Sequence, residues 1–398
     1  MNKPWYVFCD RAWGTHFNTI FLHMIKQTNF SFRTTLFICL ALAISMNISC
    51  TAYRAAMVSD EGVYYFSRVE IGGVKQSVKI RGADRNNPVM LYLHGGPGFP
   101  LFPIETRGGA MRELERHFTL VYWEQRGTGR SFSWRLPRKS MNVEQFVEDA
   151  REVAIYAMDL LDDEKVFVWG HSWGSNVGAI LASRHPGIIH AYMSTGQSVN
   201  PFKNERLNYE FVLENALRTN NHLALRQLER VDTVAQNYSL RDALLLRKWV
   251  YHYGGIVKGE LRERPYVDIG DVVNTLTAYE YSLFDKFNML ILPYFSAETL
   301  WDDLQTIDLK EMVPRIDVPV FFLVGMYDII VSATLAQEYF EMLQAPAGKE
   351  LILFEQSAHR PFSEEQEKFL DVVIDRIRPL ALPPEPGPPQ GKGHQPPL

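Results

Sequence analysis

The stretch "KVFVWGHSWGSNVGAILASRHPG", residues 165 to 187, decides the fold. Its apolar start predicts a buried strand, and the following segment has helical spacing until Pro186 ends it. Between them, GHSWG at residues 170 to 174 matches G-x-S-x-G, the pattern of a serine on a sharp turn between a strand and a helix. Because small flanking residues make such a turn sterically possible, this context predicts that Ser172 is a nucleophile rather than an ordinary loop serine.

An acid and a histidine follow this serine, each after its own predicted strand. Asp328 comes just after "VPVFFLVG", and His359 comes just after "KELILFEQSA". A serine hydroxyl is a poor nucleophile until a base accepts its proton. We therefore expect Ser172 to attack a carbonyl, His359 to take and return the proton, and Asp328 to hold the imidazole in the required tautomer.

Strands and helices alternate from about residue 60. Two strands are predicted around the Gly-Gly turn at residues 72 to 73, and a buried strand runs into a glycine-rich loop within residues 88 to 98. A helix capped by Asn142 follows, and residues 363 to 377 predict a closing helix with Ser363 as its N-cap. This alternation predicts an α/β fold with a mostly parallel sheet and helices on both faces.

The chain divides into five predicted parts. Its middle block has long, charged, aromatic-rich helical patterns without a clear buried strand, which is typical of a helical insertion. The parts are a signal- or anchor-like N-terminal segment (1–52), the first part of the core (53–199), a helical cap insertion (200–312), the second part of the core (313–378) and a disordered Pro/Gly-rich tail (379–398).

The N-terminal segment has basic residues before a short apolar run. Lys26 and Arg33 precede "LFICLALAISMNIS", residues 36 to 49, which is shorter than the roughly 18 apolar residues expected of a spanning helix. This pattern predicts export or a membrane tether, with lipidation of Cys50 as a further option. A cytoplasmic protein with an amphipathic extension, or translation starting at Met24, are the alternatives.

Composition excludes several classes of function. The chain has 398 residues, is 46% apolar and carries a net charge of −5, so it lacks the positive field that favours nucleic acid binding. All three cysteines lie within the first 50 residues, so the remainder has no disulfide framework and no thiolate metal site. The H-E-x-x-H pattern is also absent. We expect no cofactor and no metal site, and the oligomeric state is left open.

Five motifs together resemble the α/β-hydrolase superfamily and, within it, the proline iminopeptidase-like group of serine peptidases. They are "HGGPG" (94–98), "WEQRGTGRS" (123–131), "GHSWGS" (170–175), "GMYD" (325–328) and "SAHRPF" (357–362). The resemblance covers roughly residues 60 to 377. It implies an α/β-hydrolase fold with a cap, and an oxyanion hole formed by the backbone amides of Gly96 and Trp173.

Two positions depart from the group's pattern. Glu124 stands where the group usually has aspartate, and we expect the change to be tolerated because either acid can pair with an arginine such as Arg126. His171 precedes the serine where proline iminopeptidases often have glycine, whereas esterases often have histidine there. The second departure leaves the hydrolase class intact but weakens the peptidase assignment.

The substrate depends on a negative charge in the cap. An aminopeptidase must balance the free α-amino group of its substrate, because a buried ammonium without a counter-charge is costly. Glu280 in "LTAYEYSLF" resembles the aromatic-Glu segment of the group and is the expected amine ligand. Glu205, Glu210 and Glu214 are alternatives.

Three functions remain open at this point. The first is a prolyl aminopeptidase-like serine hydrolase that releases N-terminal proline or another small apolar residue from short peptides. The second is an esterase or amidase acting on a small molecule without a free amine. The third is a non-catalytic binding module, which the complete Ser172, Asp328 and His359 set disfavours.

Overall fold

An eight-stranded sheet forms the centre of the molecule, in the order β1-β2-β4-β3-β5-β6-β7-β8. The β1–β2 and β2–β4 pairs are antiparallel and all the other pairs are parallel. The strands are β1 (Val63–Ile71), β2 (Val74–Gly82), β3 (Val89–Leu93), β4 (Thr119–Glu124), β5 (Val166–His171), β6 (Ile189–Thr195), β7 (Val320–Gly325) and β8 (Lys349–Phe354). This arrangement confirms the predicted, mostly parallel α/β sheet.

The computed structural model describes only part of the chain. The described residues are 62–99, 101–102, 109–232, 239–258, 269–291 and 294–381. The predicted N-terminal segment lies outside them, as does the predicted tail beyond Ala381; the first three tail residues belong to a short 3₁₀ turn, η6 (Arg378–Ala381). Within the described ranges, no helix has the length and apolarity needed to cross a membrane.

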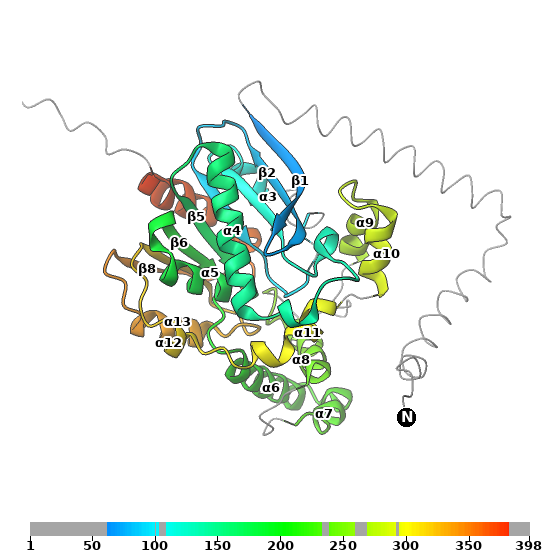
Figure 1. The fold of residues 1–398 in the computed structure, drawn as a ribbon. Helices are drawn as coiled ribbons and strands as arrows, with labels where there is room; N and C mark the ends of the chain where they lie inside the picture. The colour runs from blue at the N-terminus through cyan, green and yellow to red at the C-terminus, as the bar shows by residue number, and fades with distance from the viewer. Residues whose placement is uncertain are drawn as a thin grey trace, which may run out of the picture. The chain divides into compact units, whose positions relative to one another are not determined.

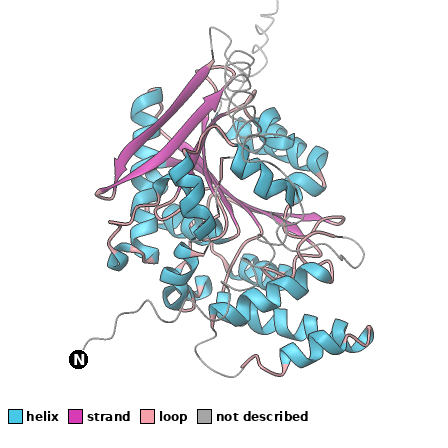
Figure 2. Ribbon diagram, turned by 90° about the vertical axis from the view of Figure 1, so that its right-hand side faces the viewer, coloured by secondary structure: helices cyan, strands magenta, loops and turns pink. Residues whose placement is uncertain are grey.

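Helices cover both faces of the sheet, as Figures 1 and 2 show. The helices are α3 (Gly109–Leu114), α4 (Val143–Leu161), α5 (Trp173–Arg184), α6 (Pro201–Arg218), α7 (His222–Leu228), α8 (Leu240–His252), α9 (Ile269–Thr277), α10 (Leu283–Ile291), α11 (Phe295–Leu304), α12 (Leu309–Met312), α13 (Ala333–Met342), α14 (Pro361–Glu364) and α15 (Gln366–Asp371). Three short 3₁₀ helices are η2 (Gly129–Ser131), η3 (Arg138–Ser140) and η4 (Pro186–Ile188), and a π-helix, η5 (Val372–Ile377), follows α15.

Alternate side chains of the strands build a separate apolar core on each face. In β5, Val168 packs into the core that contains Phe146 of α4, whereas Phe167 and Trp169 pack with Phe369 of α15 on the opposite face. Successive strand residues point to opposite sides of a sheet, so a strand buried on both faces needs an unbroken apolar run. This explains why β5 reads as a continuous apolar segment in the sequence.

The predicted helical cap lies between β6 and β7 and contains α6 to α12. Helices α6 and α8 pack around their own apolar cluster, which includes Val212, Leu246 and Val250. Ile330, from the loop after β7, belongs to the same cluster. The cap therefore packs directly on a loop at the carboxyl end of the sheet.

Of the two predicted N-cap residues, one caps its helix and the other does not. Asn142 caps α4 as predicted, because its side chain accepts a hydrogen bond from the backbone N–H of Gln145 at 2.9 Å. Ser363 is not an N-cap, because helical structure begins earlier, at Pro361. Proline fits the first helical position, where its missing N–H has no acceptor to lose.

Candidate active site

Ser172 sits on a strained turn between β5 and α5. Its backbone angles are φ 55° and ψ −123°, a conformation that residues with a side chain rarely adopt. Two glycines make the turn possible: a Cβ on Gly170 would lie 2.6 Å from the Cα of Ser175, and one on Gly174 would lie 2.0 Å from the carbonyl oxygen of Leu93. The structure thus places Ser172 as the G-x-S-x-G pattern predicts.

Asp328 and His359 meet at the ends of neighbouring strands. Asp328 follows β7, His359 follows β8, and His359 Nδ1 lies 2.8 Å from Asp328 Oδ2. The other carboxylate oxygen of Asp328 accepts the backbone N–H of Val331 at 3.1 Å, and the backbone N–H of His359 donates to Ile256 of the cap at 3.0 Å. With Nδ1 donating to the carboxylate, Nε2 is the nitrogen left to accept a proton.

Gly196 brings the serine side and the acid–histidine side together. Ser172 donates its backbone N–H to the carbonyl of Thr195 at 3.0 Å. A Cβ on the next residue, Gly196, would lie 2.9 Å from the His359 ring and 3.3 Å from Asp328 Oδ2. The three predicted residues therefore converge at the carboxyl ends of β5 to β8. Sequence reasoning missed Gly196, although a glycine directly after a predicted strand was a visible signal.

The glycine-rich loop after β3 lies directly against Ser172. A Cβ on Gly95 would be 3.0 Å from the Cβ of Ser172, and Gly96 has φ +124°, which favours glycine. Trp173 is the first residue of α5, so its amide is among those without an acceptor inside the helix. Gly96 and Trp173, the residues predicted for the oxyanion hole, thus lie on the two segments that flank Ser172.

Gln125 connects these two segments. Its side-chain nitrogen donates to the carbonyl of His94 at 3.0 Å, and its oxygen accepts the indole N–H of Trp173 at 2.8 Å. Its backbone N–H also donates to His94 Nε2 at 3.3 Å. Burial lowers the pKa of His94 to about 4, so this imidazole is neutral and can accept that bond. Gln125 belongs to the motif "WEQRGTGRS", but the sequence alone did not reveal that its side chain bridges these two segments.

His171 is a neutral neighbour of the candidate base. Burial, followed by repulsion from His359, holds the pKa of His171 well below its usual range. The two rings have centroids 4.8 Å apart, and His171 Nδ1 lies 3.1 Å from the carbonyl of Thr195. Because His171 stays uncharged, it places no positive charge beside the His359 ring.

Glu280 is buried in an ion pair rather than placed beside Ser172. Its carboxylate lies 3.1 Å from Lys79 Nζ of β2, and both side chains are almost fully inaccessible. Burial lowers the pKa of Lys79 to about 8, while the charge of Glu280 opposes that shift. Strand β2 lies three strands from β5, about 14 Å across the sheet. The charge of Glu280 is therefore already balanced by the protein, and its role as an amine ligand stays a prediction.

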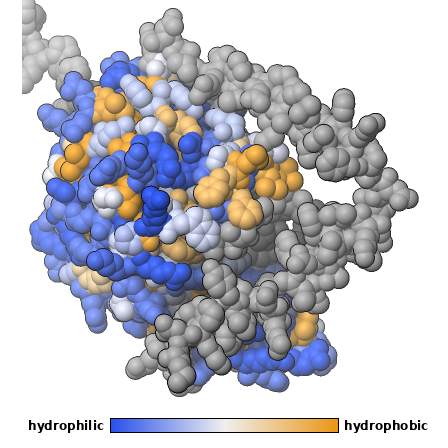
Figure 3. All heavy atoms as spheres, turned by 45° about the vertical axis from the view of Figure 1, so that its right-hand side comes forward, coloured by the Kyte–Doolittle hydropathy of each residue, from blue (hydrophilic) through white to orange (hydrophobic). Residues whose placement is uncertain are grey.

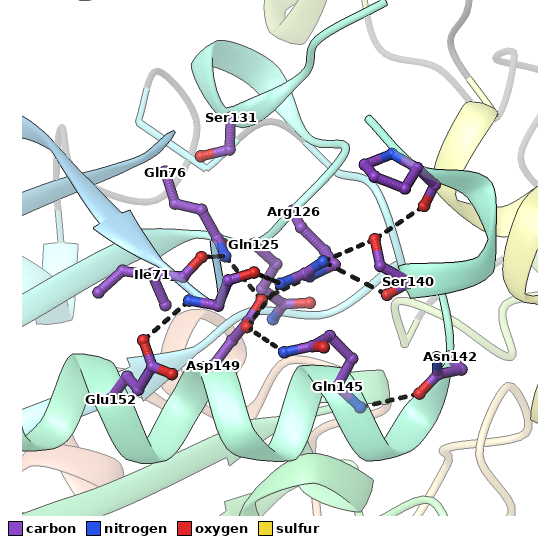
Figure 4. Close-up of polar contacts among 12 residues, drawn as sticks. Ile71, Gln76, Gln125, Arg126, Ser131, Ser140, Asn142, Gln145, Asp149 and Glu152 are labelled. Atoms are coloured by element: carbon purple, nitrogen blue, oxygen red, sulfur yellow. Dashed lines mark hydrogen bonds and ion pairs between the residues drawn. The ribbon is translucent and has the colours of Figure 1, made fainter. Parts of the chain in front are cut away.

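The expected pairing of Glu124 with Arg126 is wrong. Arg126 instead forms a two-pronged ion pair with Asp149 of α4, with N–O distances of 2.6 and 2.7 Å, as Figure 4 shows. Glu124 accepts hydrogen bonds from the Tyr281 hydroxyl and, at 2.8 Å, from the backbone N–H of Arg130. Burial raises the pKa of Glu124 to about 7. Glu124 and Arg126 thus anchor separate elements of the fold.

Another carboxylate lies buried in the cap. Glu205 of α6 pairs with Arg247 of α8 at 2.7 Å, and its second oxygen has no hydrogen-bond partner within the described residues. Asn208, one turn further along α6, is buried and has both amide atoms without a partner in the same part of the chain. Asn204, which directly precedes Glu205, accepts a hydrogen bond from the backbone N–H of Ser332 at 2.6 Å. This contact joins α6 to the loop after Asp328. Glu210 and Glu214 are exposed.

Known proteins share this architecture. Residues 88–246 match the family described as alpha/beta hydrolase fold. The chain is 30% identical to "Probable aminopeptidase YbaC" of Bacillus subtilis over 318 residues, which cover 80% of this chain and 98% of that protein. It is 22% identical to a proline iminopeptidase of Heyndrickxia coagulans, covering 77% of this chain and 96% of that one.

A solved structure supports the same fold. The crystal structure of a proline iminopeptidase from Mycobacterium smegmatis superposes with a TM-score of 0.56 at 16% identity, covering 79% of this chain and 98% of that one. At this identity the likeness concerns the fold alone. Sheet order, strand–turn–helix geometry and relatives agree: the chain belongs to the α/β-hydrolase fold family and is a hydrolase.

Proposed function

We propose that this protein is a serine aminopeptidase that releases N-terminal proline, or another small apolar residue, from short peptides. Ser172 Oγ attacks the first peptide carbonyl while His359 Nε2 takes the hydroxyl proton. The amides of Gly96 and Trp173 stabilise the resulting oxyanion. When the C–N bond breaks, His359 returns the proton to the departing peptide amine and leaves an acyl-enzyme. Water, activated by the same imidazole, then releases the amino acid and restores Ser172.

The observation that carries this proposal is the 2.8 Å contact between His359 and Asp328, beside the strained turn that presents Ser172. A base oriented by a buried acid is what a serine nucleophile requires. The names of the relatives favour peptides with a free N-terminus as the substrate class.

Glu205 is the carboxylate that we propose for the substrate's amino group. It is buried, and although one of its oxygens is paired with Arg247, the other has no partner among the described residues. It also lies on the helix that contacts the loop after Asp328. Asn208 offers a second acceptor from the same helix. Because a buried ammonium requires such partners, Glu205 takes the place first expected for Glu280.

An esterase or amidase is the second candidate, and the Lys79–Glu280 ion pair is the observation that favours it. With Glu280 already neutralised, the cap has one carboxylate fewer for an amine. A substrate without a free amine would use the same nucleophile, base and oxyanion hole without this charge.

The first test compares three substrates: a prolyl arylamide, its N-acetylated form and a short-chain aryl ester. We expect cleavage of the free-amine substrate with strong preference over the acetylated one. Ser172→Ala should lower kcat by about 10⁵-fold or more, because the nucleophile itself is lost. Cleavage of the ester alone would replace the peptidase with the esterase, and full activity of Ser172→Ala would reject the proposed mechanism.

A further inference from the structure

A helical hairpin at the edge of the cap exposes large apolar side chains to solvent. Leu283, Phe284 and Phe287 of α10 are 85%, 60% and 56% exposed, and Val273 and Leu276 of the neighbouring α9 are also exposed. Helix α10 lies at the outer side of the molecule, away from the sheet (Figure 1), and Figure 3 shows apolar side chains gathered on this side. Scattered exposed apolar residues are common, but a contiguous group marks an interaction surface.

The loop before η3 extends this apolar face. Trp134 is 60% exposed, and its indole N–H donates to Asn288 of α10 at 3.2 Å, which fixes the loop against the hairpin. The Trp134 ring also packs edge-on against Phe132, with centroids 5.4 Å apart. The contacts with Asn288 and Phe132 therefore hold Trp134 in an exposed position beside α10.

Positive charges follow Trp134 in the same loop. Arg135, Arg138 and Lys139 are exposed, and none of them has an acidic partner in the part of the chain that the structure describes. The acid nearest in sequence to the exposed α10 residues, Asp285, is instead bound by the hydroxyl of Ser282 at 2.7 Å and lies 3.8 Å from Arg130. This loop is thus cationic, although the whole chain has a net charge of −5.

We propose that α9, α10 and residues 133–139 form a face that binds the surface of an anionic lipid bilayer. Phenylalanine, leucine and tryptophan insert at the boundary between headgroups and acyl chains, while neighbouring arginine and lysine bind anionic headgroups. A neutral protein partner would use the apolar side chains but would not require three exposed cations that have no acidic partner among the described residues. The proposal concerns attachment and is independent of the reaction at Ser172.

The test measures binding of the full chain to vesicles by flotation. Vesicles of phosphatidylcholine with an equal amount of phosphatidylglycerol are compared with vesicles of phosphatidylcholine alone. We expect preferential binding to the anionic vesicles that weakens as salt is raised, because exposed charges are screened. Failure of the full chain to bind the anionic vesicles would overturn the proposal.

Two variants and one matched control locate the binding surface. Phe284→Ser/Phe287→Ser should lower partitioning by about tenfold or more, because two large apolar side chains no longer insert. Arg135→Gln/Lys139→Gln should reduce binding and its salt dependence together. Leu217→Ser/Met342→Ser removes two similarly exposed apolar side chains, 58% and 60%, from other elements and should bind as the wild type does. Thermal unfolding of each variant reports whether the fold is retained.

Three results would overturn this assignment. Unchanged binding by Phe284→Ser/Phe287→Ser would mean that another part of the chain, such as residues 36–49, carries the attachment. An equal loss in the matched control would mean that general apolarity is responsible. A wild-type dimer that Phe284→Ser/Phe287→Ser dissociates, measured by sedimentation, would mean that a second copy covers this face.

Discussion

At the residue scale, the candidate site depends on an atom that is absent: the Cβ of Gly196. The His359 ring and the Asp328 carboxylate occupy the space where that atom would lie. Gly196 also has φ +58°, which disfavours any other residue. The backbone after β6 can therefore accept the hydrogen bond from Ser172 at Thr195 while His359 and Asp328 pack against Gly196.

We expect Gly196→Ala to lower kcat by at least about 100-fold, because a misplaced base loses its alignment with the nucleophile. The measurement is steady-state hydrolysis of the substrate that the wild type cleaves. Gly187→Ala is the matched control, since a Cβ at Gly187 meets nothing within 4 Å. Equal activity of Gly196→Ala and Gly187→Ala would contradict the close approach described here.

The role proposed for Glu205 leads to a second prediction at this scale. Glu205→Gln should raise KM for free-amine substrates by about tenfold or more and affect N-acetylated substrates and esters much less, because only the free-amine substrates carry an ammonium group. Glu210→Gln, in the same helix but exposed, is the control. A loss of the same size on blocked and free substrates would remove Glu205 from the amine site.

At the scale of elements, local features could be predicted from the sequence and distant partnerships could not. The strand–turn–helix around Ser172 and the cap of α4 by Asn142 depend on neighbours a few residues apart, and both were predicted. The partner of Glu280 is 201 residues away, in a strand where Lys79 stands between apolar residues. A charge inside a buried strand signals that a partner exists, but the sequence does not say which one.

The Lys79–Glu280 ion pair joins the cap to strand β2 of the sheet. Glu280→Gln should lower the free energy of unfolding by about 3 to 5 kcal/mol, because Lys79 would remain buried without its counter-charge. Lys79→Met/Glu280→Gln should recover part of that loss. Denaturant unfolding measures both variants. Unchanged stability of Glu280→Gln, with a selective loss of activity on free-amine substrates, would restore the amine-binding role first expected for Glu280.

At the scale of the whole molecule, a buried carboxyl links the sheet to the cap. Glu124 of β4 accepts the hydroxyl of Tyr281, which lies between α9 and α10, and the N–H of Arg130 from η2. Burial is the largest cause of its raised pKa, and these hydrogen bonds only partly oppose it. Ionisation of Glu124 therefore costs stability across the interface of two parts of the fold.

This leads to a pH dependence with a definite sign. The pKa of Glu124 is about 7 in the folded protein, against an ordinary value of 4.5. The contribution of protonated Glu124 to the free energy of unfolding is therefore full below pH 4.5 and is lost as the pH rises through 7. The loss is roughly 3 kcal/mol for a shift of this size. Glu124→Gln should flatten the fall in unfolding free energy between pH 5 and 8, whereas Glu229→Gln, an exposed control, should not. Parallel curves for Glu124→Gln and wild type would refute this role.

The position of the cap between β6 and β7 also determines when activity can arise during synthesis. Tyr192 of β6 pairs with Val320 of β7, and the entire cap is made between them. Domains begin to fold while the chain is still emerging, and contacts between distant residues form slowly. The strands that hold Ser172 are complete long before Asp328 and His359 leave the ribosome. A chain that ends before Asp328 therefore carries Ser172 without the acid–histidine pair, and we expect it to lack the activity proposed above.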